Sequence, residues 1–63
     1  MVKITNERMA DINKTTGAPI MYIEGTYESG DTLPTTDIYQ GSWMLNLTDQ
    51  SVVFFKASNS TWG

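Results

Sequence analysis

The sequence predicts a mainly β fold: one domain over residues 1–63, built as a small sandwich-like or barrel-like antiparallel sheet that ends in a hairpin. The first supporting observation is a series of short segments in which apolar residues alternate with period two. The second is that turns rich in Gly, Pro, Asn and Ser separate these segments, a pattern typical of all-β domains. The third is composition, because 40% apolar and 17% charged residues describe a folded chain rather than a disordered one.

The N-terminal segment, residues 2–13, leaves strand and helix open. Val2 and Ile4 alternate as they would in a strand. Thr5 or Asn6, however, could cap a short N-terminal helix, because both side chains can accept hydrogen bonds from the first turn of a helix. We favour the strand for this segment.

The middle of the chain predicts one strand followed by one long connection. Residues 18–27 alternate on two apolar faces and are broken or bulged at Gly25. One face of this strand carries Ile20 and Tyr22, and the other carries Met21 and Ile23. Residues 28–41 are polar, and Pro34 near their centre argues against a regular element there.

The C-terminal hairpin, over residues 42–57, is the most secure element of the prediction. With Asp49 and Gln50 as its turn, the two strands would pair in a defined register. The pairs would be Leu47 with Val52, Leu45 with Phe54, and Trp43 with the stem of Lys56. A final turn would return Trp62 toward the sheet.

Both faces of this hairpin are too apolar for simple exposure to water. One face carries Trp43, Leu45, Leu47 and Phe54, and we expect it to form the core against Ile20, Tyr22 and Trp62. The opposite face carries Met44, Val53 and Phe55. One core is enough for so short a chain, so we expect another polypeptide to cover this second face, although the N-terminal residues are an alternative cover. The predicted interface residues are therefore Met44, Val53, Phe55 and the tyrosine Tyr39.

Groups that carry catalytic or metal chemistry are scarce. The chain has no histidine and no cysteine, so Ser42 and Ser51 lack the usual activating base and the usual zinc ligands are missing. Three acidic residues lie in the long loop, but their spacing matches no calcium-binding loop: Glu28, Asp31 and Asp37. We therefore expect no catalytic residue, no metal, no cofactor and no small-molecule substrate.

Charge argues against nucleic acid as a partner, and hydrophobicity argues against a membrane. The net charge is −3, and the basic residues are concentrated before residue 15, with Lys56 alone after it. No basic stripe with interleaved aromatic residues is present, so we expect no nucleic-acid binding. No segment has the length and hydrophobicity of a membrane span, so we expect no membrane partner.

Residues 30–62 combine turn and hairpin segments in a characteristic order: Leu33-Pro34-Thr35, Gly41-Ser42, Trp43-Met44-Leu45, a polar turn, Val52-Val53-Phe54-Phe55 and Thr61-Trp62. This order resembles small virion-associated structural proteins of tailed bacteriophages, of the capsid decoration or minor structural type. The sequence departs from that pattern at the hairpin tip, where such proteins often carry Asp-Thr-Gly and this chain has Thr48-Asp49-Gln50-Ser51. The resemblance implies a part of the virion and transfers no active site.

The resulting expectation is a non-enzymatic bacteriophage structural protein. It would assemble in the host cytoplasm with other virion proteins or as a homo-oligomer, as a capsid decoration, cement or minor capsid component. One alternative is a phage-encoded inhibitor that binds a host defence protein or enzyme. A second is a small ligand- or carbohydrate-binding β module, in which Trp43 or Trp62 stacks on the ligand.

Overall fold

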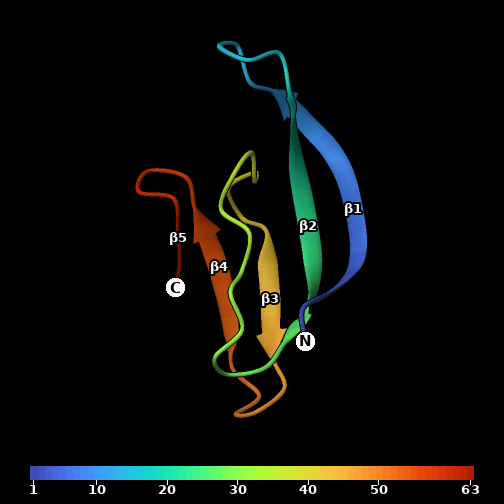
Figure 1. Cartoon of the computed structure of the whole chain (residues 1–63), viewed down its shortest axis with the longest axis vertical. Coiled ribbons are helices and arrows are strands. Elements are labelled where there is room, and N and C mark those ends of the chain that lie inside the picture. Colours follow the sequence, from blue (N-terminus) through green and yellow to red (C-terminus); the bar gives the residue numbers. More distant parts are fainter.

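Five strands and no helix make up the computed structural model, which describes residues 1–63. They are β1 (Lys3–Ile12), β2 (Pro19–Tyr27), β3 (Trp43–Asn46), β4 (Val52–Lys56) and β5 (Thr61–Trp62). They form one open sheet whose spatial order is the order of the chain (Figure 1). The prediction of a mainly β fold is confirmed. The more specific prediction of a sandwich or barrel is wrong, because residues 28–41 form an irregular connection and leave too few strands for a second sheet.

The N-terminal segment is the long edge strand β1, so the favoured strand is confirmed and no helix forms there. It pairs with β2 in antiparallel fashion and shifts register twice, between Ile4 and Asn6 and between Met9 and Asp11. Every residue of β1 is exposed. Hydrogen bonding to β2 therefore holds this strand in place more than burial does.

Strand β2 runs through Gly25 without a break, so the bulge predicted there is wrong. The register irregularities lie on the neighbouring strand β1 instead. Gly25 is buried where the backbone of β1 passes closest: a Cβ atom on it would overlap the carbonyl oxygen of Lys3. The glycine is thus explained by close packing of two backbones rather than by a turn.

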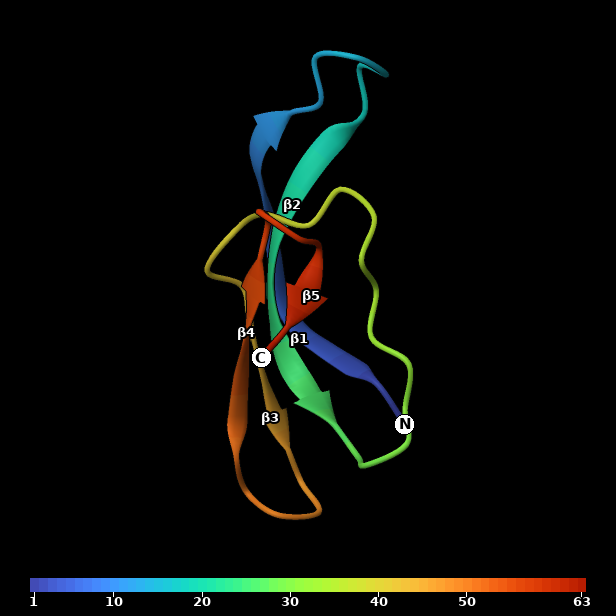
Figure 2. The ribbon, with the colours of Figure 1, turned by 90° about the vertical axis from the view of Figure 1, so that its left-hand side faces the viewer.

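The contact between β2 and β3 is parallel, which makes the sheet mixed rather than antiparallel. Parallel neighbours need a connection that returns along the whole strand, and residues 28–42 supply it. The first part of this connection (green) lies on one side of the sheet, and its last part (yellow) crosses to the other side just before β3 (Figure 2). The connection is tied to β2 by an isolated bridge between Met21 and Ile38, with the Tyr39 amide donating to the Met21 carbonyl at 2.7 Å.

The core lies between this connection and the sheet, on the face that we call the inner face. Its apolar members are Ile23, Met44 and Phe55, with 3%, 0% and 3% of their surfaces exposed. The Phe55 and Trp62 rings meet edge to face at a centroid distance of 5.2 Å. The Trp62 indole N–H donates to the Pro34 carbonyl at 2.8 Å, so β5 and the loop close over the core together.

The hairpin β3–β4 is present, but its register differs from the predicted one by two residues. Trp43 pairs with Phe54 and Leu45 pairs with Val52, and residues 47–50 form a longer loop. Side-chain hydrogen bonds stabilise this loop: the Asn46 carboxamide oxygen accepts from the Thr48 amide at 2.8 Å. Because the shift is an even number of residues, each side chain stays on its predicted face.

Ser42 gives a first testable prediction, because its hydroxyl is fully buried and used twice. It accepts from the Ile23 amide at 3.0 Å and donates to the Tyr39 carbonyl at 2.8 Å. Ser42→Ala would leave both groups without this partner, and we expect the free energy of unfolding to fall by about 1–3 kcal/mol. Urea unfolding measures the loss. The control Ser51→Ala removes an exposed hydroxyl bonded only to Asp49, and an equal loss in both variants would contradict this role.

Candidate protein interface

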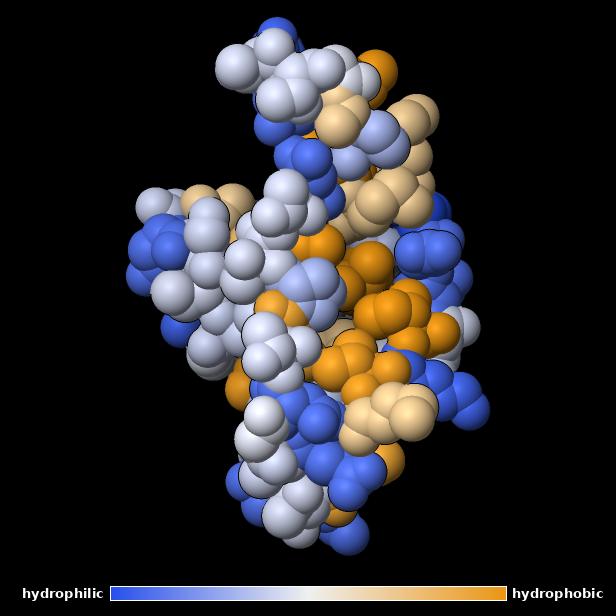
Figure 3. All heavy atoms as spheres, viewed as in Figure 1, coloured by the Kyte–Doolittle hydropathy of each residue, from blue (hydrophilic) through white to orange (hydrophobic).

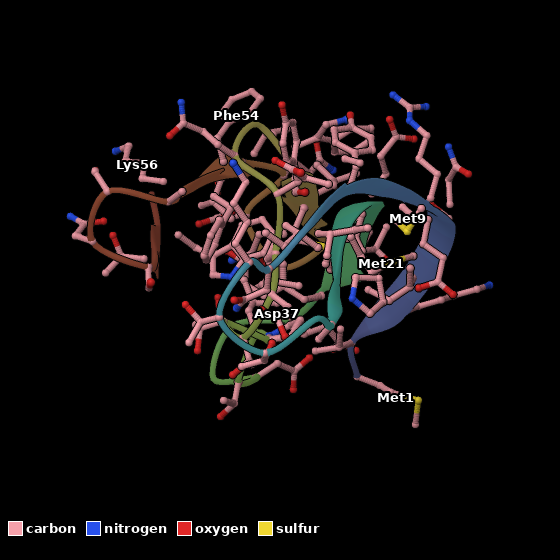
Figure 4. The ribbon with its side chains drawn as sticks, turned by 90° about the horizontal axis from the view of Figure 1, so that it is seen from above. Met1, Met9, Met21, Asp37, Phe54 and Lys56 are labelled. Carbon is pink, nitrogen blue, oxygen red and sulfur yellow. The ribbon has the colours of Figure 1, made fainter.

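The outer face of the sheet is the candidate functional site. Cross-strand partners point to the same side of a sheet, so the pairs Trp43–Phe54 and Leu45–Val52 share one face, opposite the buried Met44. We call these four residues the outer patch. Phe54 points to the side of the sheet opposite Asp37, which lies in the covering loop (Figure 4).

The outer patch is open to solvent. Phe54 is 50% exposed and Val52 is 44% exposed, while Trp43 and Leu45 are half-buried. Leu47, which follows β3 in the hairpin loop, is 53% exposed. Large apolar side chains that gather on one exposed face are typical of interaction surfaces, whereas single ones are common on any protein.

A polar cluster adjoins the outer patch on β1 and β2; it consists of Asn6, Arg8, Tyr22 and Glu24. The Arg8 guanidinium lies over the Tyr22 ring, 4.6 Å from its centroid. The Tyr22 hydroxyl donates to Glu24 at 2.8 Å, and the Asn6 carboxamide donates to the other oxygen of Glu24 at 3.4 Å. Glu24 and Trp43 are register partners, so this cluster and the patch are continuous. Tyrosine, tryptophan and arginine are the residues most enriched at binding hot spots.

Hydrogen bonding sets the electrostatics of the cluster. The hydrogen bond from Tyr22, followed by that from Asn6, lowers the pKa of Glu24 below its ordinary value of 4.5. The same bond to Glu24 raises the pKa of Tyr22 above its ordinary value. Glu24 is therefore ionised and Tyr22 neutral at neutral pH, with the cluster's hydrogen bonds intact.

This ionisation gives a prediction for the pH dependence of stability. Because the pKa of Glu24 is lower in the folded state, the unfolded chain binds a proton more readily, and the stabilisation is present above pH 4.5 and is lost as the pH falls through the folded pKa. We expect the thermal unfolding temperature of the wild type to fall as the pH is lowered from about 5 to about 3, the range in which carboxyl groups take up protons. Glu24→Gln should reduce that slope. An unchanged slope would show that Glu24 does not contribute.

The structure places two of the four predicted interface residues inside the protein. Met44 and Phe55 are buried in the chain's own core, so the expectation that they are open to solvent in the free protein is wrong. The physical reason is that the loop 28–41 and Trp62 cover the inner face. Val53 is half-buried on the same face, and Tyr39 is 42% exposed.

The exposure of the outer patch is a second difference from the prediction, which places Trp43, Leu45 and Phe54 in the core. Trp62 packs on Phe55 of the inner face and not against the outer patch. The hairpin sequence alone carries little signal to separate the two faces, since both are apolar. One difference between the two faces is their polar residues: Ser42 and Asn46 alternate with Met44 and so lie on the same face. Both are buried, and the Ser42 hydroxyl accepts a hydrogen bond from the Ile23 amide, so these small polar residues mark the covered face.

The acidic residues of the loop do not act as one group. Glu28 and Asp31 lie beside the amino group of Met1, at 3.2 and 2.8 Å. Asp37 instead accepts from the Asn13 carboxamide at 2.9 Å. No set of three acidic side chains is placed to hold a metal ion, and the surface has no pocket.

Edge pairing is a less suitable mode of association than contact through a face. The edge strand β1 carries two register shifts and a mixed set of charged side chains: Lys3, Glu7, Arg8 and Asp11. Bulges and charges on an edge are the features that keep natural sheets from pairing edge to edge. The other edge, β5, has only two residues.

Comparison with known proteins adds no relative. No protein family, curated protein or solved structure matches this chain. The structure also contains no helix of the length and hydrophobicity needed to cross a membrane.

Proposed function

We propose that this protein is a non-enzymatic structural subunit that assembles through its outer face, as a decoration or minor component of a tailed-bacteriophage virion. The observation that carries the proposal is the outer patch, an uncovered apolar surface on a sheet one layer thick. The assignment to a virion comes from the resemblance of residues 30–62 to small phage structural proteins.

The small core supports assembly. Only 6 of 63 residues are buried, although the chain has no cysteine to form a disulfide. A domain of this size has little stability in reserve, and association is one of the few ways to gain more. The exposed side chains of the outer patch would supply that gain when a partner covers them.

The experiment is detection of this chain in purified phage particles. We expect mass spectrometry of gradient-banded virions to find it in a fixed ratio to the other structural proteins. Phe54→Ser should lower that ratio, because it introduces a polar group into the outer patch. Ile12→Ser is the matched control, since Ile12 on β1 is 51% exposed and Phe54 is 50% exposed. Expression during infection without incorporation into particles would contradict the proposal and favour an inhibitor of a host protein.

A further inference from the structure

We infer that the outer patch binds the outer patch of a second copy of this chain, so that two sheets pack face to face as a sandwich. The inference rests on the proposed use of the outer face for assembly and names its first occupant.

A sheet that is apolar on both faces needs a cover on each. On the inner face the chain covers the core itself, through the loop 28–41 and Trp62, whereas Met9 and Ile12 of β1 stay exposed at its border. The space-filling view shows that cover, with an apolar strip still visible beside it (Figure 3). On the outer face no segment of the chain lies over the outer patch. A second sheet at the usual spacing of about 10 Å would complete the missing layer.

The size of the face suits a dimer. The molecule extends over 36 × 22 × 16 Å, so the broad side of the sheet is 36 by 22 Å at most. A stable interface of standard size buries about 800 Å² on each partner. That is roughly a fifth of the 4235 Å² accessible surface of the chain. Because the broad side is no larger than that area, a dimer interface of standard size takes up the whole outer face, with the outer patch and the polar cluster both in it.

The charge distribution permits two copies to meet in this way. The chain is negative overall, yet the outer patch itself has no charged residue. Around the patch the charges of the outer face nearly balance. The register places Lys3 and Arg8 on this face, and Lys56 lies toward the Phe54 side of the sheet (Figure 4). The same register places two carboxylates there, Asp11 opposite Ile20 and Glu24 beside Trp43. The acidic residues Glu28, Asp31 and Asp37 lie in the connection on the inner side. Two outer faces therefore approach without the repulsion that the net charge of −3 would otherwise cause.

A two-fold axis through the outer patch gives each copy the same contact. Trp43 and Phe54 are register partners on neighbouring strands, and in an isologous dimer their rings meet apolar groups of the other copy. The polar cluster of Asn6, Arg8, Tyr22 and Glu24 then lies toward the rim, where its internal hydrogen bonds and water satisfy it.

The test is sedimentation equilibrium of the purified full-length chain over a range of concentrations. We expect a mass of twice 7.0 kDa that dissociates on dilution. Phe54→Ser should raise the dissociation constant by roughly thirty-fold or more, the size of a typical hot-spot loss. Ile12→Ser, with the same exposure, should leave the dissociation constant unchanged. Circular dichroism of each variant establishes that it is folded.

A fluorescence measurement on Trp43 checks the interface without altering it. Trp62→Phe keeps a ring against Phe55 and leaves Trp43 as the one tryptophan, and we expect its emission to move to shorter wavelength as the dimer forms. A chain that remains monomeric up to about 1 mM overturns the inference. So does an equal loss of association in Ile12→Ser, or Trp43 emission that does not change with concentration. A monomer that is found in virions would contradict this inference alone, whereas a dimer that is absent from virions would contradict the proposed virion function alone.

Discussion

Replacing Phe55 with alanine is expected to remove a large part of the protein's free energy of unfolding. Phe55 is one of three buried apolar residues, and its ring packs edge to face on Trp62. Removal of a buried phenylalanine ring costs about 3–5 kcal/mol. A domain of 63 residues has a total free energy of unfolding of only about 3–9 kcal/mol. Far-ultraviolet circular dichroism and thermal unfolding measure the loss.

The neighbouring phenylalanine provides a matched control. Phe54 is the residue before Phe55 in β4, but it points to the outer face and is 50% exposed. At concentrations where the chain is monomeric, we expect Phe54→Ala to change the free energy of unfolding by less than about 1 kcal/mol. Equal losses in the two variants would mean that both faces of β4 are buried, and would contradict the assignment of inner and outer faces.

Substitution of Gly25 by alanine is expected to separate β1 from β2. The added Cβ would overlap the Lys3 carbonyl oxygen and would lie 3.1 Å from the Ile4 Cα. Both are backbone atoms, so no side-chain rotation relieves the overlap and the strand itself must move. Overpacking of this kind costs about 1–3 kcal/mol and more where the backbone cannot adjust. Amide hydrogen exchange should show loss of protection in the ladder between β1 and β2.

Thr26→Ala is the control for Gly25→Ala. Thr26 is the next residue of β2, its side chain points to the outer face, and it pairs with Lys3. This variant changes the same part of the ladder without adding an atom against the β1 backbone. We expect it to keep the β1 amides protected. Protection that survives in Gly25→Ala as well would show that β1 can shift to make room.

The sequence predicts the elements of this fold better than it predicts which face is inside. Period-two alternation identifies the strands and sorts Met44 from Leu45, because neighbouring residues in a strand must point to opposite sides. Alternation does not say which side is covered. That depends on where the loop 28–41 lies, and the loop is held by long-range contacts such as the one between Trp62 and Pro34. For this reason the prediction places the core on the face that is exposed in the structure, and the interface on the face that is buried.

The parallel pairing of β2 with β3 could not be predicted from the sequence either. Antiparallel pairing is the usual outcome for strands joined by short turns, but residues 28–42 are long enough to return to the start of β2. Three positions on this path have positive φ and allow the sharp changes of direction that the return needs: Gly30 at 93°, Asp37 at 56° and Gly41 at 92°. The polar composition of these residues predicts a loop, but it does not predict the path that the loop follows across the sheet.

The parallel contact between β2 and β3 has a consequence for the order of folding. Each neighbouring pair, β1 with β2 and β3 with β4, is joined by a short connection and can form from contacts that are close in sequence. The contact between the pairs has four register partners and requires closure of the long connection first. We expect the two hairpins to form early and to join late, so that the hydrogen bond from the Leu47 amide to the Tyr27 carbonyl is among the last to form. On this pathway the native state would open first along the line between β2 and β3, which would release two hairpins that each keep their own turn.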